Sequence, residues 1–203
     1  MRNQAELVSH LRQSGVLRSK MLIDAFLTID RADFIPDPLS LQAYEDHPLP
    51  IGYGQTISQP FTVAFMLEAL QIRQNDLVMD IGAGSGWTTA LMATMAKQVI
   101  GLDRIKELVT FANSNLTKYS FQNAIVLNAG SQLGIPQMQF DKILVSAAAH
   151  TFPSTLLDQL KPDGTLVIPV ANAIIVCHKD KNGHVRHHQF DGFVFVPLIT
   201  SDN

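Results

Sequence analysis

The feature that most constrains the fold is a glycine-rich segment, Asp80 to Gly86, which reads Asp-Ile-Gly-Ala-Gly-Ser-Gly. The apolar run Leu77 to Ile81 leads into it and is typical of a buried strand, and a helix is expected from Thr88 to about Ala96. Glycines at such a junction let the backbone turn tightly and let a nucleoside approach without a Cβ in the way. The helix start also offers unpaired amides to an anionic group. The segment predicts a nucleoside site, with an ordinary strand-to-helix turn as the alternative.

Two residues near this segment narrow the choice of ligand. A dinucleotide fingerprint requires Gly or Ala at its sixth position, and Trp87 occupies that position, which disfavours NAD. Asp103 ends the next expected strand, 21 residues after Gly82, where a carboxylate can accept hydrogen bonds from ribose hydroxyls. Its alternative role is to cap the helix that begins near Ile105. A nucleoside bound without a pyrophosphate points to S-adenosylmethionine.

Strands and helices alternate beyond Leu77. Further apolar runs of strand type are Gln98 to Leu102, Ala124 to Leu127, Lys142 to Ser146 and Thr165 to Val170. Helices are expected between the strands, including Ile105 to Lys118 and Pro153 to Leu160. This alternation predicts right-handed crossovers and a mainly parallel sheet that is covered on both faces.

The two ends of the chain have other patterns. Helical spacing predicts helices at about Gln4 to Gln13, Ser19 to Ile29 and Pro60 to Leu70, and the proline-rich segment Arg31 to Gly54 suggests an ordered loop. Near the C-terminus, Asn182-Gly183 predicts a hairpin turn. The hairpin strands would be Ile174 to His178 and Val185 to Phe190, and Phe193 to Leu198 is expected to add one more strand. An antiparallel C-terminal edge on the parallel sheet follows.

Composition excludes several classes of function. The formal net charge of −3 supplies no basic field for a nucleic-acid partner. No stretch approaches the roughly 18 apolar residues of a membrane-spanning helix, and the polar start of the chain is unlike a signal peptide. The single cysteine, Cys177, cannot form an internal disulfide, so a reducing compartment is favoured and we expect a cytoplasmic protein.

Beyond these patterns, the chain resembles a known family. Residues Pro50 to Pro60 read Pro-Ile-Gly-Tyr-Gly-Gln-Thr-Ile-Ser-Gln-Pro and are similar to the signature of the protein-L-isoaspartate O-methyltransferases, P-I-G-x-G-Q-T-I-S-x-P. The similarity covers most of the chain from about Ile29 onward. Other segments that resemble the family in register are Arg31 to Pro36, Asp80 to Leu91, Asp141 to Ala148, Lys161 to Val170 and Phe195 to Leu198.

The resemblance implies methyl transfer from S-adenosylmethionine to the free α-carboxylate of L-isoaspartyl residues in damaged proteins or peptides. Ser58 would orient this carboxylate as the catalytic residue. The implied substrate-binding residues are Thr56, Ile57, Ser58 and Val196. The alternative for Thr56 and Ser58 is a structural role, in which they cap a turn or the next helix. The implied cofactor-binding residues are Asp80, Gly82, Ala83, Gly84, Ser85, Gly86, Asp103, Arg104, Ala129 and Gly130.

These patterns together predict one domain over residues 1–203, with a Rossmann-like α/β fold of S-adenosylmethionine-dependent methyltransferase type. Residues 1–60 would hold the N-terminal helices and the substrate-side loop, 61–170 the cofactor-binding core, and 171–203 the hairpin and an edge strand. We expect a monomer without a metal ion. The histidines at 184, 187 and 188 are read as a solvated hairpin, because strand geometry turns His187 away from the other two.

Three positions depart from the family pattern. The acidic residue of the family's G-D-G, implied to lie near the adenine, is replaced by Gly130, and the proline of its A-A-P by Ala149, which could loosen a loop beside the cofactor. The usual Tyr or His after the signature is Phe61. Two rival hypotheses therefore stay open: a non-catalytic homologue that binds the cofactor, and a methyltransferase acting on another carboxylate or small molecule.

Overall fold

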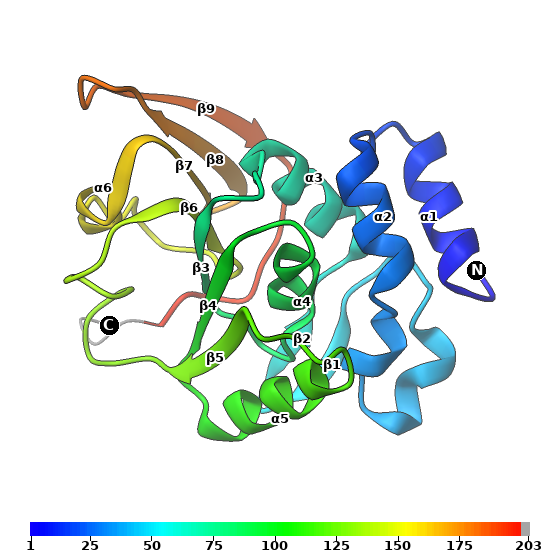
Figure 1. Ribbon diagram of the computed structural model, residues 1–203. Helices are drawn as coiled ribbons and strands as arrows, with labels where there is room; N and C mark the ends of the chain where they lie inside the picture. The colour runs from blue at the N-terminus through cyan, green and yellow to red at the C-terminus, as the bar shows by residue number, and fades with distance from the viewer. Residues whose placement is uncertain (200–203) are drawn as a thin grey trace.

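A seven-stranded sheet forms the centre of the computed structural model, which describes residues 1–199 (Figure 1). Its strand order is β5-β4-β3-β6-β7-β8-β9. The first five strands in this order run parallel, and the pairs β7–β8 and β8–β9 are antiparallel. The strands are β3 (Leu77–Ile81), β4 (Gln98–Asp103), β5 (Ala124–Asn128), β6 (Phe140–Val145), β7 (Leu160–Val170), β8 (Ala173–Lys179) and β9 (Val185–Asp191).

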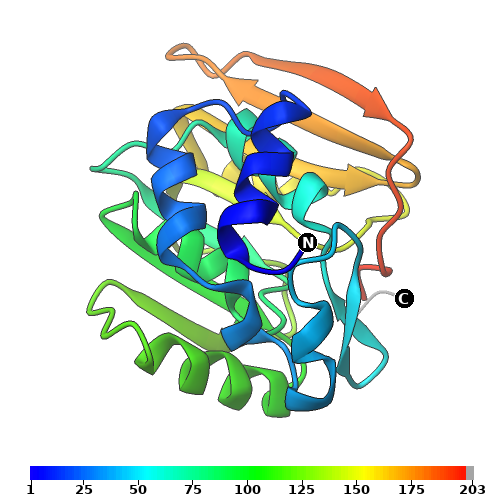
Figure 2. The same cartoon turned by 90° about the vertical axis from the view of Figure 1, so that its right-hand side faces the viewer.

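Helices cover both faces of the sheet unequally. Side chains alternate across each strand, so that Val78 of β3 joins the larger core under the main helices while Met79 joins a smaller core on the opposite face. The larger core is covered by α1 (Gln4–Gln13), α2 (Lys20–Thr28), α3 (Pro60–Leu70), α4 (Trp87–Ala93) and α5 (Lys106–Thr117). The smaller core is covered by α6 (Thr155–Asp158) and the loop between β5 and β6. Figure 2 shows α1 and α2 in front, with the hairpin β8–β9 along one edge.

The predicted Rossmann-like arrangement is confirmed, including its antiparallel C-terminal edge and the three N-terminal helices. The segment predicted to be an ordered loop contains two 3-10 turns, η1 (Arg31–Phe34) and η2 (Asp37–Gln42), and the strand β1 (Leu49–Gly52). β1 pairs with β2 (Gln55–Ile57) as a separate antiparallel ribbon. Among residues 1–199, no helix is long and apolar enough to cross a membrane.

Two expected elements are wrong. Phe193 to Leu198 is not a strand of the sheet, because Gly192 turns the chain at φ +94° and only Pro197 forms a bridge, to Ala148. No helix lies between β5 and β6, where Gly134 has φ +74° and a proline follows soon after. The side chain of Gln159 holds this loop instead, because its Oε1 accepts from the Ile135 N–H at 2.7 Å.

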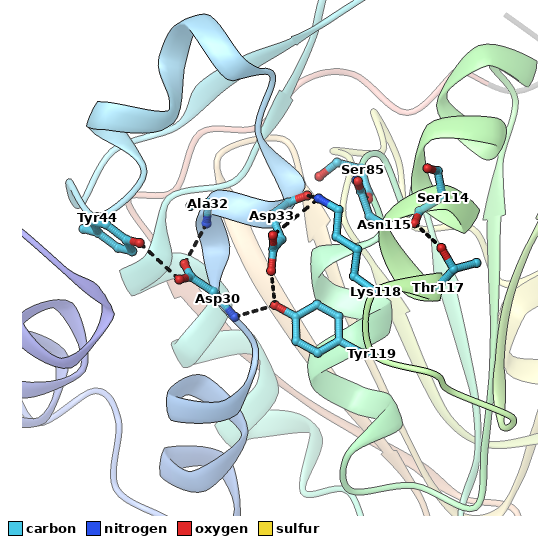
Figure 3. A network of polar contacts seen from close by, with 10 residues as sticks. All are labelled: Asp30, Ala32, Asp33, Tyr44, Ser85, Ser114, Asn115, Thr117, Lys118 and Tyr119. Atoms are coloured by element: carbon cyan, nitrogen blue, oxygen red, sulfur yellow. Dashed lines mark hydrogen bonds and ion pairs between the residues drawn. The ribbon is translucent and has the colours of Figure 1, made fainter.

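A polar network ties the N-terminal layer to the sheet domain (Figure 3). The Tyr119 hydroxyl, which follows α5, donates to Asp33 Oδ2 at 2.5 Å and accepts from the Asp30 N–H at 2.9 Å. Lys118 Nζ donates to the Asp33 carbonyl at 2.7 Å. Burial and the adjacent Asp33 carboxylate raise the pKa of Tyr119, so its hydroxyl remains a donor at neutral pH. Tyr119 also stacks on Phe34 at 5.8 Å, which fixes η1 against α5.

The network predicts that Tyr119→Phe destabilises the fold. The variant keeps the stacked ring but leaves Asp33 Oδ2 and the Asp30 N–H without this hydroxyl, so the free energy of unfolding should fall by about 1–2 kcal/mol. Urea unfolding measures the change. Tyr53→Phe is the matched control, because Tyr53 is 60% exposed, and it should leave stability unchanged. Equal stability of the two variants would contradict a role for the network.

Candidate functional site

The glycine loop between β3 and α4 has a backbone that only glycine adopts readily at three positions. Gly82, Gly84 and Gly86 have φ of +78°, +56° and +87°. A Cβ at Gly86 would lie 3.1 Å from the Cβ of Ala112, so this glycine also lets the loop pack closely on α5. The Gly82 N–H donates to the Leu102 carbonyl at 2.8 Å, which anchors the loop to the end of β4. These three glycines and the Gly82 bond therefore fix the shape of the loop at the carboxyl ends of the parallel strands.

Asp103 lies at the end of β4, where its carboxylate binds two backbone amides. Its Oδ2 accepts from the Gly84 N–H and its Oδ1 from the Ile105 N–H, each at 2.9 Å. The carboxylate thus shapes the glycine loop and begins the turn into α5. Although the residue is only 7% exposed, it lines both of the cavities described below.

Asp80 lies behind the loop and is fully buried. Its Oδ2 accepts hydrogen bonds from the hydroxyls of Thr88 and Thr89 at 2.7 and 2.6 Å. Burial raises the pKa of Asp80 to about 6; the threonine hydroxyls oppose the shift and the negative charge of Asp103 adds to it. Asp80 lines neither of the cavities beside the loop, so its contacts fix the start of α4 and do not reach a ligand directly.

On the opposite wall, the guanidinium of Arg31 holds the segment that carries Ser58. Its Nη2 donates to the carbonyls of His47 and Ser58 at 2.9 and 3.1 Å, and its Nη1 to the carbonyl of Ala43 at 2.7 Å. Arg31 is fully buried, and its guanidinium carbon lies 5.3 Å from the ring centroid of Trp87. Burial lowers the pKa of Arg31 to about 10, so the group remains charged at neutral pH.

Asp46 completes this wall from the other side of Ser58. Its Oδ1 accepts from the Phe61 N–H at 2.8 Å, in the first turn of α3, and its carbonyl accepts from Gln59 Nε2 at 3.0 Å. A carboxylate at a helix N-terminus satisfies an amide that the helix itself leaves unpaired. The backbone around Ser58 is consequently fixed on both sides.

The two walls enclose a small hollow of about 50 Å³, here called the central cavity. Every predicted substrate residue lines it, together with most of the glycine loop. From the predicted set it is lined by Thr56, Ile57, Ser58, Gly82, Ala83, Gly84, Ser85, Asp103 and Val196. Segments far apart in the sequence thus meet at one point, where Figure 2 shows the C-terminal segment descending past the β1–β2 ribbon.

A second hollow of about 300 Å³, here called the sheet-edge cavity, continues from the central cavity along the ends of β3, β4 and β5. Both cavities share Gln55, Gly82, Asp103 and Ala147. The predicted residues Arg104, Ala129 and Gly130 line the sheet-edge cavity. Of the predicted cofactor residues, Asp80 and Gly86 line neither cavity and act through the shape of the loop.

Several lining residues are missed by the sequence analysis. They include Gln55, which belongs to the family signature, and Ser146 and Ala147, which follow the carboxyl end of β6. Open parallel sheets bind ligands at the carboxyl ends of their strands. The signature and the strand end could therefore have identified all three residues from the sequence. Within residues 1–199, the Ser85 hydroxyl and the Trp87 indole N–H are buried without a hydrogen-bond partner. Buried polar groups are nearly always paired, so both lining residues fit a site that receives a polar ligand.

The departure at Ala149 does not loosen its loop. The Ala149 N–H donates to the Pro169 carbonyl at 3.0 Å, and the Ala149 carbonyl accepts from the Ala171 N–H at 2.9 Å. A proline at this position could not form the first of these bonds. The loop at Ala149 is therefore held by two backbone hydrogen bonds, one of which a proline would remove.

The fold and the two joined cavities define a Rossmann-like methyltransferase. The family model for protein-L-isoaspartate(D-aspartate) O-methyltransferase matches residues 2–203, and this chain belongs to that family. A protein-L-isoaspartate O-methyltransferase from Methanopyrus kandleri is 40% identical, with 98% of this chain and 92% of that protein covered. One from Pyrococcus abyssi is 38% identical, with 95% and 92% covered. A Plasmodium falciparum relative, described as a protein-L-isoaspartate O-methyltransferase and crystallised with S-adenosyl-L-homocysteine, superposes with a TM-score of 0.86, 27% identity and coverage of 98% and 99%.

The buried Asp80 carboxyl predicts a specific pH dependence of stability. Because its folded pKa of about 6 lies above its ordinary value of 3.8, the folded state binds this proton more tightly than the unfolded state. The stabilisation is therefore complete below pH 3.8 and is lost as the pH rises through about 6. We compare the free energy of unfolding of the wild type with that of Asp80→Asn. The difference, wild type minus variant, should fall by up to roughly 3 kcal/mol between about pH 4 and pH 7.

Urea unfolding at several pH values measures this difference. The matched control is Asp37→Asn, because Asp37 is exposed and its carboxylate forms no ion pair with the described residues. Its difference from the wild type should stay flat over the same pH range. A difference for Asp80→Asn that is constant or rises with pH would contradict the assigned pKa direction.

Proposed function

We propose that this chain is an S-adenosylmethionine-dependent methyltransferase that methylates the free α-carboxylate of L-isoaspartyl residues in damaged proteins or peptides. The observation that carries the proposal is the central cavity, where the signature residues Thr56 to Ser58 and the glycine loop line the same space. Family membership over residues 2–203 supports the same activity.

The residues of the cavities fit the cofactor by their chemistry. Asp103 would hold the ribose hydroxyls through its carboxylate, and the sheet-edge cavity beside Ala129 and Gly130 would hold the base. Ser85 and Trp87, whose hydroxyl and indole N–H have no partner within residues 1–199, line the central cavity and would bind the polar amino-acid end. When bound, S-adenosylmethionine supplies a methyl group on a positively charged sulfonium, which is open to attack by a nucleophile.

The substrate carboxylate requires no general base, because a carboxyl group of ordinary pKa is already ionised at neutral pH. Asp103 is the one ionisable side chain among the described residues that line the central cavity, and its two oxygens already hold the Gly84 and Ile105 amides. The task of the protein is therefore alignment. Positioned reactants can account for roughly 7–11 kcal/mol of a barrier.

Ser58 is the residue that we assign to this alignment. Ser58 lines the central cavity, and its hydroxyl has no partner within residues 1–199, so it is free to donate to the substrate carboxylate. Thr56, Ile57 and the backbone of Val196 border the same position. The ester formed by methyl transfer is an activated carboxyl derivative: attack by the next amide nitrogen closes a succinimide and releases methanol, and hydrolysis yields some normal aspartate.

We further propose that the enzyme acts as a cytoplasmic monomer on protein and not on nucleic acid. The net charge of −3 and the lone buried Cys177 support this reading.

Ser58→Ala tests the substrate side of the site. Loss of one hydrogen bond to a charged group should lower kcat/KM for an isoaspartyl peptide by about ten- to hundredfold, while the affinity for S-adenosylhomocysteine stays within about twofold of wild type. Labelled methyl transfer and calorimetry measure the two quantities. Ser114→Ala, on the exposed face of α5, is the control and should behave as wild type. Full activity of Ser58→Ala would exclude the assigned role.

Asp103→Asn tests the cofactor side and should show the opposite pattern. An amide in place of the carboxylate sets an NH₂ group against the N–H of Gly84 or Ile105 and removes the charge that strengthens ribose hydrogen bonds. The dissociation constant for S-adenosylhomocysteine should rise by about tenfold or more. The KM for peptide at saturating cofactor should change much less. Unchanged cofactor affinity would contradict this assignment.

A further inference from the structure

A third hollow of about 610 Å³, here called the outer cavity, opens beside the central cavity. The two share Thr56, Ser58, Ser146 and Val196, so the outer cavity begins at the position assigned to the substrate carboxylate. An isoaspartyl residue placed there is joined to a polypeptide on both sides. The neighbouring part of the substrate must leave through the space that adjoins Ser58.

The outer cavity has an uncharged lining. Its apolar wall is formed by Pro48, Phe61, Val194 and two phenylalanines of the C-terminal segment, Phe193 and Phe195, while the polar remainder is hydroxyl and amide. No Asp, Glu, Lys, Arg or His lies among the described residues that line it. The next hollow beyond Phe61 differs, because Arg18, Glu68 and His188 line it. The absence of charge is thus particular to the space beside Ser58.

The aromatic wall is held in place by packing. Phe193 lies 5.0 Å from Phe65 of α3, measured between ring centroids, and Phe65 lies 5.1 Å from Phe190 of β9. Offset and edge-on arrangements at such distances are favourable. These contacts join the C-terminal segment to α3 and β9.

The backbone along this wall has unused donors. Gly192 and Phe193 both donate their N–H groups to the Asn172 carbonyl, whereas the N–H groups of Val194 and Val196 have no partner within residues 1–199. Unpaired amides along an irregular segment can bind the main chain of an extended peptide, while side chains enter adjoining hollows. The segment Gly192 to Val196 therefore offers both kinds of contact to a polypeptide.

We propose that the outer cavity is a specificity subsite that binds a residue flanking the isoaspartate, and that it selects an uncharged, preferably apolar or aromatic, side chain there. Phe61, Phe193 and Val194 are the specificity-determining residues. The proposal rests on the proposed function and deepens it. Its physical basis is that a charged side chain entering this space would lose water and find no opposite charge.

The first test uses isoaspartyl peptides that are identical except for one neighbour of the isoaspartate, which is Leu, Lys or Glu on either side. At one of the two neighbours, kcat/KM for the Leu peptide should exceed that for both charged peptides by about tenfold. Equal values for all peptides would overturn the subsite while leaving the proposed function intact. Absence of methylation on every isoaspartyl peptide would overturn the proposed function and this proposal with it.

The second test introduces a charge without disturbing the fold. Val194 is 88% exposed at the opening of the outer cavity, so Val194→Lys should fold as wild type. It should raise the ratio of kcat/KM for the Glu peptide over the Lys peptide by a few fold, and added salt should reduce the gain. Leu41→Lys, with the same charge change at a residue that is 92% exposed and lines none of these cavities, should leave the ratio unchanged. An equal change in both lysine variants, or none in Val194→Lys, would contradict the proposal.

Discussion

The buried guanidinium of Arg31 connects the two walls between which the site is formed. It holds the carbonyls of the loop before β1 and of Ser58 on one side, and it lies over the ring of Trp87 at the start of α4 on the other. A buried charge is costly unless it is hydrogen-bonded, and the surrounding carbonyls satisfy Nη1 and Nη2 of Arg31, while its Nε has no partner within residues 1–199. This group thus helps to set the position of Ser58 relative to the glycine loop.

The parallel sheet determines where the residues of the site meet. Parallel strands place their carboxyl ends at one edge, which brings the glycine loop after β3, Asp103 at the end of β4 and Ser146 after β6 together. The antiparallel hairpin β8–β9 then returns the chain to this edge, where Gly192 directs the C-terminal segment across it. The cofactor surface thus comes from the middle of the chain, whereas the substrate surface combines the segment around Ser58 with the C-terminal segment at Val196.

Much of this arrangement was predictable because local patterns and the fold agree. The glycine loop, Asp103 and the signature around Ser58 carry their geometry in their residue types, and the structure brings them together as expected. The role of Asp80 was not predictable, because its burial and its threonine partners depend on how α4 packs. Nor was the path of Phe193 to Leu198, an apolar run of strand type that a positive-φ glycine and a proline divert from the sheet. Arg31 was visible only as part of a motif, since its carbonyl partners, three in the stretch Ala43 to His47 and one at Ser58, are brought to it by the fold.

The most direct test of the account is methyl transfer from labelled S-adenosylmethionine to two peptides that differ only in having L-isoaspartate or L-aspartate at one position. The account predicts base-labile labelling of the isoaspartyl peptide alone, because only its free α-carboxylate reaches the space beside Ser58 while the chain continues through the outer cavity. Labelling of both peptides, or of neither despite measurable cofactor binding, would contradict it.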